Sequence, residues 1–402
     1  MLSIKKLLLS VSMTAATLTA TAQGGNVGLG GSEGNYQSLA ERVLKLEKKN
    51  NIFNAYFNFS AAGKAEENDG NWKTGFIGKQ FRLEIKGDIT EKIHYRLRHR
   101  LNRSTAQESV DNFSSATDIL MVAYDVVPQF TIMGGKMCAH YGGFEFDENP
   151  VYVYQLSDMV NNMDNFHIGI ALSFKPVPSQ EFIAEVQNVT NSNLNEYYGE
   201  DAKAVEGSLD NLTTIEESNS QLTYILNWNG NFFDKKLQTR WSWGLRHQAK
   251  NTWSRVWVFG QQLNLNKLQW YFDYMGSWDG IDRLKIANSE LRALTSAKNP
   301  VFTKVHYNSF ITQLKWQFYK QWNLELKGIY ETASVSGIEK LKNYRKAITY
   351  IGSVEYFPVK QQDFKVYLAY IGKSFRYTEE STLKNYSTNK IELGMQYRLK
   401  LY

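Results

Sequence analysis

The chain has 402 residues, a formal net charge of +6 and an aromatic content of 14%, and its mean hydropathy is negative. Its one cysteine, Cys138, cannot form an internal disulfide bond. Beyond the first 22 residues no apolar run is long enough for a transmembrane helix, and the modest net charge argues against a nucleic-acid-binding protein.

The first 22 residues have the pattern of a secretory signal peptide. Lys5 and Lys6 precede the apolar run 7–13, and TATA at 19–22 contains an A-x-A cleavage motif. We therefore expect export and cleavage near Ala22; an ordinary buried helix is the alternative. Because cleavage removes two lysines and no acids, the formal charge falls from +6 to +4.

The next two segments differ in composition. Residues 23–35 are rich in Gly, Ser and Asn and are typical of a flexible linker. Residues 36–51 place Leu39, Val43 and Leu46 at four-three spacing, which predicts a short periplasmic coiled-coil helix. Two heptads are too short to be stable alone, so we expect the helix to add to another oligomer contact. A lone amphipathic helix packed on the main domain is also open.

From residue 52 to residue 402 the sequence alternates long strands and turns. Most of the expected strands have ten or more residues, which exceeds the usual globular strand and matches a tilted membrane strand. The sixteen expected strands are 52–61, 74–87, 92–103, 116–127, 129–137, 165–175, 181–190, 220–229, 236–249, 252–264, 267–278, 304–318, 322–334, 346–357, 363–377 and 389–402. The fold class predicted is all-β: a sixteen-stranded antiparallel transmembrane β-barrel.

The connections alternate between short turns and long loops, which is typical of an outer-membrane barrel. The expected long loops are 62–73, 104–115, 138–164, 191–219, 279–303, 335–345 and 378–388. A tight link near Asn251 is the exception on the long-loop side. An even strand number places both chain ends on the periplasmic side. The predicted location is therefore the outer membrane of a Gram-negative bacterium, in contact with its lipid.

The last strand carries an assembly signal. Ile391, Leu393 and Met395 share one parity, whereas Arg398 and Lys400 share the other. An apolar outer face near a final aromatic residue resembles the signal that the barrel assembly machinery reads, so that machinery is an expected partner during biogenesis.

The stretch 92–103, KIHYRLRHRLNR, contains an arginine ladder. Arg96, Arg98 and Arg100 share one parity, and Leu97 and Leu101 share the other, so the arginines stand on one face of a strand about 6.7 Å apart. By itself this face suits solvent on a soluble sheet, a nucleic acid or a water-filled lumen. In a barrel the lumen is favoured, because arginine near the lipid midplane costs about 2–4 kcal/mol per residue.

The same alternation along other strands predicts further basic side chains in the lumen. We expect Glu84, which lies between Arg82 and Lys86, to neutralise these two residues in part. The candidate pore-lining residues are Arg82, Lys86, Arg96, Arg98, Arg100, Arg240, Arg246 and Arg398. These charges either guide anions or only keep the lumen wet. His99 and Arg255 fall on the outward parity, which burial at a subunit interface would explain.

Three motifs carry a family resemblance. YRLRHRLNR at 95–103, MGGKM at 133–137 and YGGFEFDENPVYVYQLSD at 141–158 resemble the phosphate-selective porin O and P family. The resemblance implies a sixteen-stranded homotrimeric barrel that passes anions such as phosphate. It also implies that the third long loop, here 138–164, folds inward and narrows the pore.

One family feature is reduced in this chain. The early-loop lysine cluster of phosphate channels is represented only by Lys64 and Lys73 within 62–73. This difference concerns strict phosphate or polyphosphate selectivity and not the resemblance to a porin.

Residues 191–220 are strongly acidic, with Lys203 as their one base. The seven acids are Glu196, Glu200, Asp201, Glu206, Asp210, Glu216 and Glu217. With this loop's −6 set apart from +4, the rest of the mature chain carries about +10, which raises the local anion concentration near a narrow lumen. The loop is either a Ca²⁺ site, since Ca²⁺ prefers carboxylate oxygens, or a solvated surface loop.

We expect no enzymatic activity and, apart from Ca²⁺, no cofactor. Ser157, Asp158 and His167 are near each other only in sequence, and the six histidines show no metal-binding or hydrolase motif. The predicted function is an outer-membrane porin for passive diffusion of small anions. The alternative is a non-conducting structural or adhesive barrel.

Overall fold

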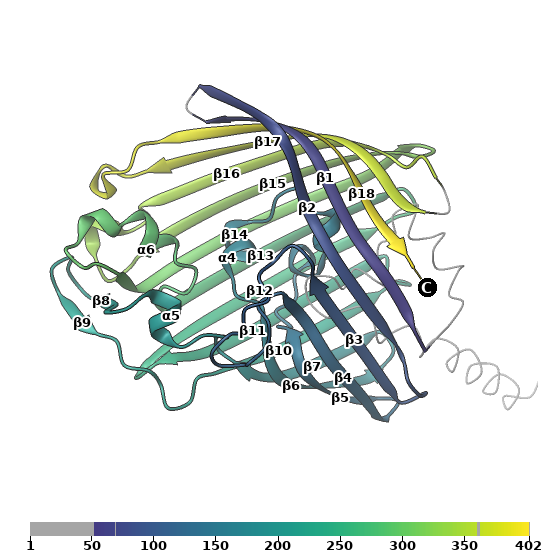
Figure 1. Cartoon of the computed structure of the whole chain (residues 1–402), viewed down its shortest axis with the longest axis horizontal. Coiled ribbons are helices and arrows are strands. Elements are labelled where there is room, and N and C mark those ends of the chain that lie inside the picture. The colour runs from purple at the N-terminus through teal and green to yellow at the C-terminus, as the bar shows by residue number, and fades with distance from the viewer. Residues whose placement is uncertain (1–51, 69, 360–361, 402) are drawn as a thin grey trace, which may run out of the picture.

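The computed structural model describes residues 52–68, 70–359 and 362–401, so the predicted signal peptide, linker and coiled-coil helix lie outside the described residues. Within these ranges sixteen strands form a closed antiparallel barrel (Figure 1). The barrel strands are β1 (Asn54–Asn68), β2 (Asn71–Asp88), β3 (Ile93–Arg100), β4 (Thr117–Val127), β5 (Phe130–Cys138), β6 (Phe166–Val177), β7 (Gln180–Asn188), β10 (Leu222–Phe232), β11 (Leu237–Ala249), β12 (Thr252–Asn264), β13 (Leu268–Ile281), β14 (Pro300–Tyr319), β15 (Trp322–Val335), β16 (Arg345–Tyr356), β17 (Asp363–Tyr377) and β18 (Tyr386–Lys400).

Each strand pairs with its neighbours in the chain, β7 pairs with β10, and β1 closes the ring against β18. The predicted sixteen-stranded barrel is confirmed. The tight link near Asn251 is also present, because β11 and β12 are separated by two residues and Asn251 has a φ of 56°.

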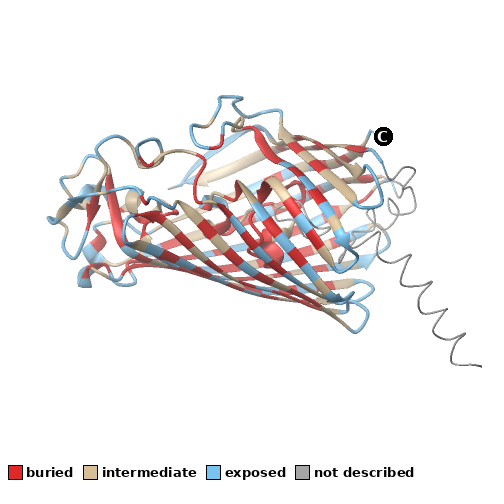
Figure 2. Ribbon diagram, turned by 90° about the horizontal axis from the view of Figure 1, so that it is seen from below, coloured by how far each residue is buried: buried red, intermediate tan, exposed pale blue. Residues whose placement is uncertain are grey.

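The strands are apolar outside and largely polar inside. On β12, Trp257 and Phe259 are exposed, whereas the alternate residues Ser254 and Gln262 are buried. Figure 2 shows this alternation as a checkerboard of buried and exposed residues along the wall. Since successive side chains of a strand point to opposite faces, the pattern gives one lipid-facing surface and one lumen-facing surface.

The prediction that residues 62–73 form a long loop is wrong. β1 and β2 continue to pair up to Asn68 and Asn71, with Gly70 in the turn at a φ of 78°. Because β3 ends at Arg100, opposite Arg82, the outer part of β2 has no strand on its other side. The β1–β2 hairpin therefore projects beyond the barrel, at the top of Figure 1.

The longer connections contain short helices and strands. These lie at the end of the barrel opposite the C-terminus (Figure 1). These elements are α5 (Leu194–Tyr198), β8 (Lys203–Val205), β9 (Leu212–Thr214), α6 (Ile286–Glu290), η4 (Arg292–Leu294), η5 (Glu339–Leu341) and η6 (Glu379–Ser381). β8 pairs in parallel with the start of β14. In the described part of the chain, none of the helices has the length and apolar character needed to cross a membrane.

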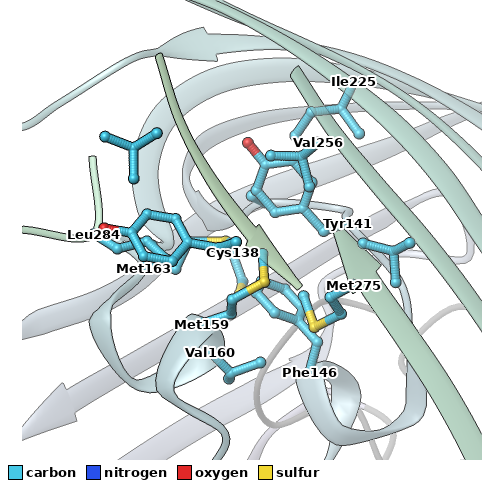
Figure 3. Packing of buried hydrophobic residues seen from close by; sticks show 14 of the residues in the cluster. Cys138, Tyr141, Phe146, Met159, Val160, Met163, Ile225, Val256, Met275 and Leu284 are labelled. Atoms are coloured by element: carbon cyan, nitrogen blue, oxygen red, sulfur yellow. The ribbon is translucent and has the colours of Figure 1, made fainter. Parts of the chain in front are cut away.

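The hydrophobic core lies inside the barrel, around the connection between β5 and β6. This connection holds α3 (Phe144–Asp147), η3 (Pro150–Tyr152) and α4 (Asp158–Asn162). Its side chains Phe146, Met159 and Val160 belong to one buried cluster with Val256 and Met275, which point inward from β12 and β13 (Figure 3). The cluster thus fills part of the lumen and fixes the loop against the wall.

Candidate functional site

The arginine ladder faces the lumen but is almost completely buried. Arg96 and Arg98 are 6% and 1% exposed. Arg96 Nη2 lies 2.6 Å from Glu84 Oε1 on β2, and Arg98 Nε lies 3.2 Å from Asp118 Oδ2 on β4. Both arginines therefore form cross-strand ion pairs, and neither is open to a permeating ion.

Asp118 joins three arginines of this wall, a role that the sequence pattern did not indicate. Besides Arg98, it pairs with Arg82 at 3.5 Å and with Arg100 at 2.7 Å. The β3–β4 register shifts between Arg98 and His99, and Asp118 is the residue left without an opposite partner. A β-bulge of this kind reverses the parity of a strand, so Asp118 turns inward together with Ile119.

Arg398 on β18 completes this group. Its Nη2 lies 3.8 Å from Glu84 Oε2, and its guanidinium stands 4.2 Å from the centre of the Tyr56 ring. Lys86 Nζ lies 5.3 Å from the same ring. Glu84 forms its ion pairs with Arg96 and Arg398, which come from neighbouring strands. It also attracts Arg82 and Lys86 electrostatically, as the partial neutralisation predicted from the sequence requires. We call Arg82, Arg96, Arg98, Arg100, Arg398, Glu84 and Asp118 the arginine cluster.

Arg240 and Arg246 on β11 are not part of the arginine cluster. They hold the connection 139–165 between β5 and β6, which we call the lumen loop. Arg240 Nε is 3.4 Å from Asp147 Oδ2, and Arg246 Nε donates a hydrogen bond of 2.6 Å to the Tyr141 hydroxyl. The Arg246 guanidinium also stacks 4.6 Å from the Tyr141 ring centre, a cation–π contact. Both arginines therefore attach the loop to the wall.

The YGGF motif shapes the start of this loop. Gly142 and Gly143 have φ values of 68° and 85°, a conformation that glycine adopts without strain. The turn aims the N–H groups of Phe144 and Glu145 at the Asp273 carboxylate on β13, at 2.7 and 2.8 Å. Two glycines with positive φ and one inward carboxylate therefore determine the local conformation of this motif.

Ion pairs attach the rest of the loop to β15, β16 and β17. Glu145 is buried and lies 2.6 Å from Lys327 Nζ on β15. Asp158 pairs with Lys373 and, at 2.5 Å, with Arg345. Burial by itself would raise the pKa of Asp158, but these two cations outweigh it and hold the pKa below its usual range.

Ser157, Asp158 and His167 do not form a catalytic arrangement. The Ser157 hydroxyl donates to Glu145, Asp158 pairs with Arg345 and Lys373, and His167 pairs with Asp164 at 3.2 Å. Each of the three is engaged separately in holding the loop.

The acidic segment 191–220 distributes its carboxylates among different partners. Glu206 pairs with Lys304, Glu216 pairs with Lys250, and Glu217 accepts a hydrogen bond from the Leu194 N–H. Among residues 52–68, 70–359 and 362–401 no group of three or more His, Cys, Asp or Glu side chains has the spacing of a metal site. Calcium binding by this segment stays a prediction.

The two outward polar residues have different surroundings. His99 Nδ1 lies 3.1 Å from the Thr117 hydroxyl on the neighbouring strand, so its ring has a partner within this chain. Arg255 is exposed on the lipid-facing surface of β12.

A closed barrel with an apolar outside, a charged inside and an inward-folded loop defines an outer-membrane channel protein of the porin class. The chain belongs to the phosphate-selective porin O and P family, whose family model matches residues 53–399. The predicted family is thereby confirmed. No curated protein matches the sequence.

Solved structures with this fold include the outer-membrane channel DcaP of Acinetobacter baumannii, which is 9% identical, covers 86% of this chain and 97% of its own, and has a TM-score of 0.59. In vitro folded OmpT of Vibrio cholerae is 9% identical over 86% of this chain and 97% of its own, with a TM-score of 0.51. OmpF of Salmonella typhi, in complex with daunomycin, is 11% identical with the same coverage and a TM-score of 0.52. These identities establish the fold alone.

Proposed function

We propose that this outer-membrane porin conducts small anions, phosphate among them, by passive diffusion. The observation that carries the proposal is the unequal number of charges in the arginine cluster. Among the described residues of this wall, five guanidinium groups surround two carboxylates, Glu84 and Asp118. In the loop between β5 and β6, the carboxylates Glu145, Glu148 and Asp158 each face at least one cation.

The excess positive charge acts on ions in two ways. The side chain of Arg100 is 26% exposed, whereas that of Arg98 is 1% exposed, so Arg100 is the member that an ion reaches. The buried arginines contribute through their field, because charges that ion pairs do not cancel raise the local concentration of counter-ions in a narrow lumen. An anion is then attracted without being enclosed, which conduction requires.

Conductance of the purified protein in planar lipid bilayers tests the proposal. We expect stepwise ion conductance. Under a salt gradient, the reversal potential should have the sign that indicates anion selectivity. Closure in three equal steps would support the homotrimer that we also propose; Vibrio cholerae OmpT, a protein of this fold, has been solved in a trimer form. Absence of conductance in correctly folded protein would favour the structural or adhesive barrel.

Anion selectivity should rise as the pH falls from 7.5 to 5. Burial raises the pKa of Asp147 to about 6, although Arg240 and His140 partly oppose the shift and Glu181 adds to it. Below pH 6 this carboxylate takes up a proton and becomes neutral, so the lumen gains one positive charge.

Reversal potentials of the wild type and of Asp147→Asn at both pH values measure this effect. The variant should be more anion-selective than the wild type at pH 7.5 and should depend less on pH. His140 accounts for the remaining dependence: burial would lower its pKa, but Glu185 raises it overall. An identical pH dependence in both proteins would contradict the role given to Asp147.

A further inference from the structure

The outward surface of β12–β17 carries charges of one sign. In these fully described strands every acidic residue points inward and is at most 2% exposed; the six are Asp273, Asp279, Glu325, Glu331, Glu355 and Asp363. The outward charged residues are basic, namely Arg255, Lys304, Lys346 and Arg376, and all four are exposed. Lys304 faces Glu206 of a loop at 3.5 Å. The other three make no ion pair with any described residue.

Lys346 and Arg376 stand directly opposite each other. They are paired positions on β16 and β17, and Lys346 is also opposite Thr332 on β15. Like charges placed directly opposite on an antiparallel pair repel each other and destabilise the sheet. The Arg376 side chain donates a hydrogen bond of 3.0 Å to the carbonyl of its neighbour Phe375, which leaves its charge without an anionic partner among the described residues. An anion between the two side chains would remove this repulsion.

Their height along the wall indicates which anion reaches them. Lys346 follows the first residue of β16, and Arg376 precedes the last residue of β17, so both stand at the long-loop end. Two residues further along β16, about 6.7 Å away, Ile348 begins the apolar surface. Ile348 and Leu368 are 50% and 54% exposed and face lipid. The basic pair therefore lies at the boundary of the hydrocarbon layer, where lipid headgroups are found.

We propose that Lys346 and Arg376 bind the phosphate group of an anionic lipid in the outer leaflet of the outer membrane. The guanidinium of Arg376 offers a planar pair of donors that matches phosphate oxygens, and the ammonium of Lys346 adds a second positive charge. The long apolar stems of both side chains extend along the lipid-facing wall while the charges reach the headgroup layer.

Arg255, at the same long-loop end of the barrel, is also placed to contact a lipid headgroup. It lies near the long-loop end of β12, on the lipid-facing parity between two partly exposed tryptophans, Trp253 on its own strand and Trp278 opposite it on β13. Tryptophan is enriched at the membrane interface. A cation flanked by interfacial aromatics suits contact with a lipid headgroup better than insertion into the hydrocarbon layer.

Native mass spectrometry of the detergent-solubilised protein tests the proposal, with a bisphosphorylated lipid A as the probe. The variant Lys346→Gln/Arg376→Gln should bind it about tenfold more weakly, because charge-assisted contacts to phosphate are lost. The charge-conserving variant Lys346→Arg/Arg376→Lys should retain binding. The matched control Lys267→Gln/Lys320→Gln removes two exposed cations at the short-turn end and should bind like the wild type.

The experiment also distinguishes a lipid phosphate group from free inorganic phosphate, because both present the same anion to the two side chains. Dephosphorylated lipid A should bind the wild type as weakly as the bisphosphorylated form binds the glutamine variant, and millimolar inorganic phosphate should not displace the lipid. Equal lipid binding by the wild type and the glutamine variant would overturn the proposal. Displacement by inorganic phosphate would overturn it too, since the site would then recognise free phosphate. Retention of the heat-sensitive gel mobility of a folded barrel establishes that each variant is folded.

Discussion

Replacing Arg96, Arg98 and Arg100 together with alanine should lower the anion-to-cation permeability ratio about tenfold at low salt. The change leaves two arginines against Glu84 and Asp118, so the excess charge of the arginine cluster disappears. Three unit charges roughly 8 Å from an ion change its energy by about 1.5 kcal/mol in water, which corresponds to roughly tenfold. Reversal potentials under a salt gradient measure the ratio, and screening should weaken the effect at high salt.

A second variant, expected to change the permeability ratio in the opposite direction, strengthens the test. Asp118→Asn removes one carboxylate from the same cluster and should raise the ratio, whereas the triple variant lowers it. An unchanged ratio in the triple variant would place selectivity elsewhere, and the loop 138–164 would be the next candidate. We also expect the triple variant to be less stable than a typical lumen substitution, because it removes guanidinium groups from the buried Asp118.

Substituting Glu145 with alanine should release the lumen loop from the wall and increase the single-channel conductance. Glu145 and Lys327 are both buried and lie 2.6 Å apart. Removing one partner of a buried ion pair costs about 3–5 kcal/mol, since the remaining charge has lost its counter-ion. The Ser157 N–H also loses its 3.0 Å hydrogen bond to Glu145. We expect larger and noisier conductance and faster proteolytic cleavage within 139–165.

The double variant Glu145→Leu/Lys327→Met separates loop release from a general loss of packing. Because it replaces both charges with apolar groups of similar size, the loop should remain attached and the conductance should stay near the wild-type value. Equal conductance in the wild type and in Glu145→Ala would show that the other contacts of the loop, such as Asp158 with Arg345, hold it without Glu145.

The sequence alone predicted the barrel, because the period of two along a strand is a local property that burial on one face makes visible. Ile93 and Leu97 alternate with Arg96 and Arg98, and the same alternation recurs in strand after strand. The lumen-facing parity of the arginine ladder followed from the same pattern. The C-terminal strand, with Arg398 buried on the inward face and Met395 exposed on the outward face, was predictable for this reason too.

The ion pairs required the tertiary structure, because they depend on which strands are neighbours and where a strand is irregular. Parity alone would point Asp118 toward lipid, and only the bulge between β3 and β4 turns it toward Arg98. Glu84 and Arg398 are distant in sequence and meet because the barrel closes. The residues of the lumen loop were visible as a motif, but their attachment depends on side chains of β13 and β15 such as Asp273 and Lys327. A local pattern determines the face on which a side chain lies, whereas its partner is determined by strand closure, register and loop packing.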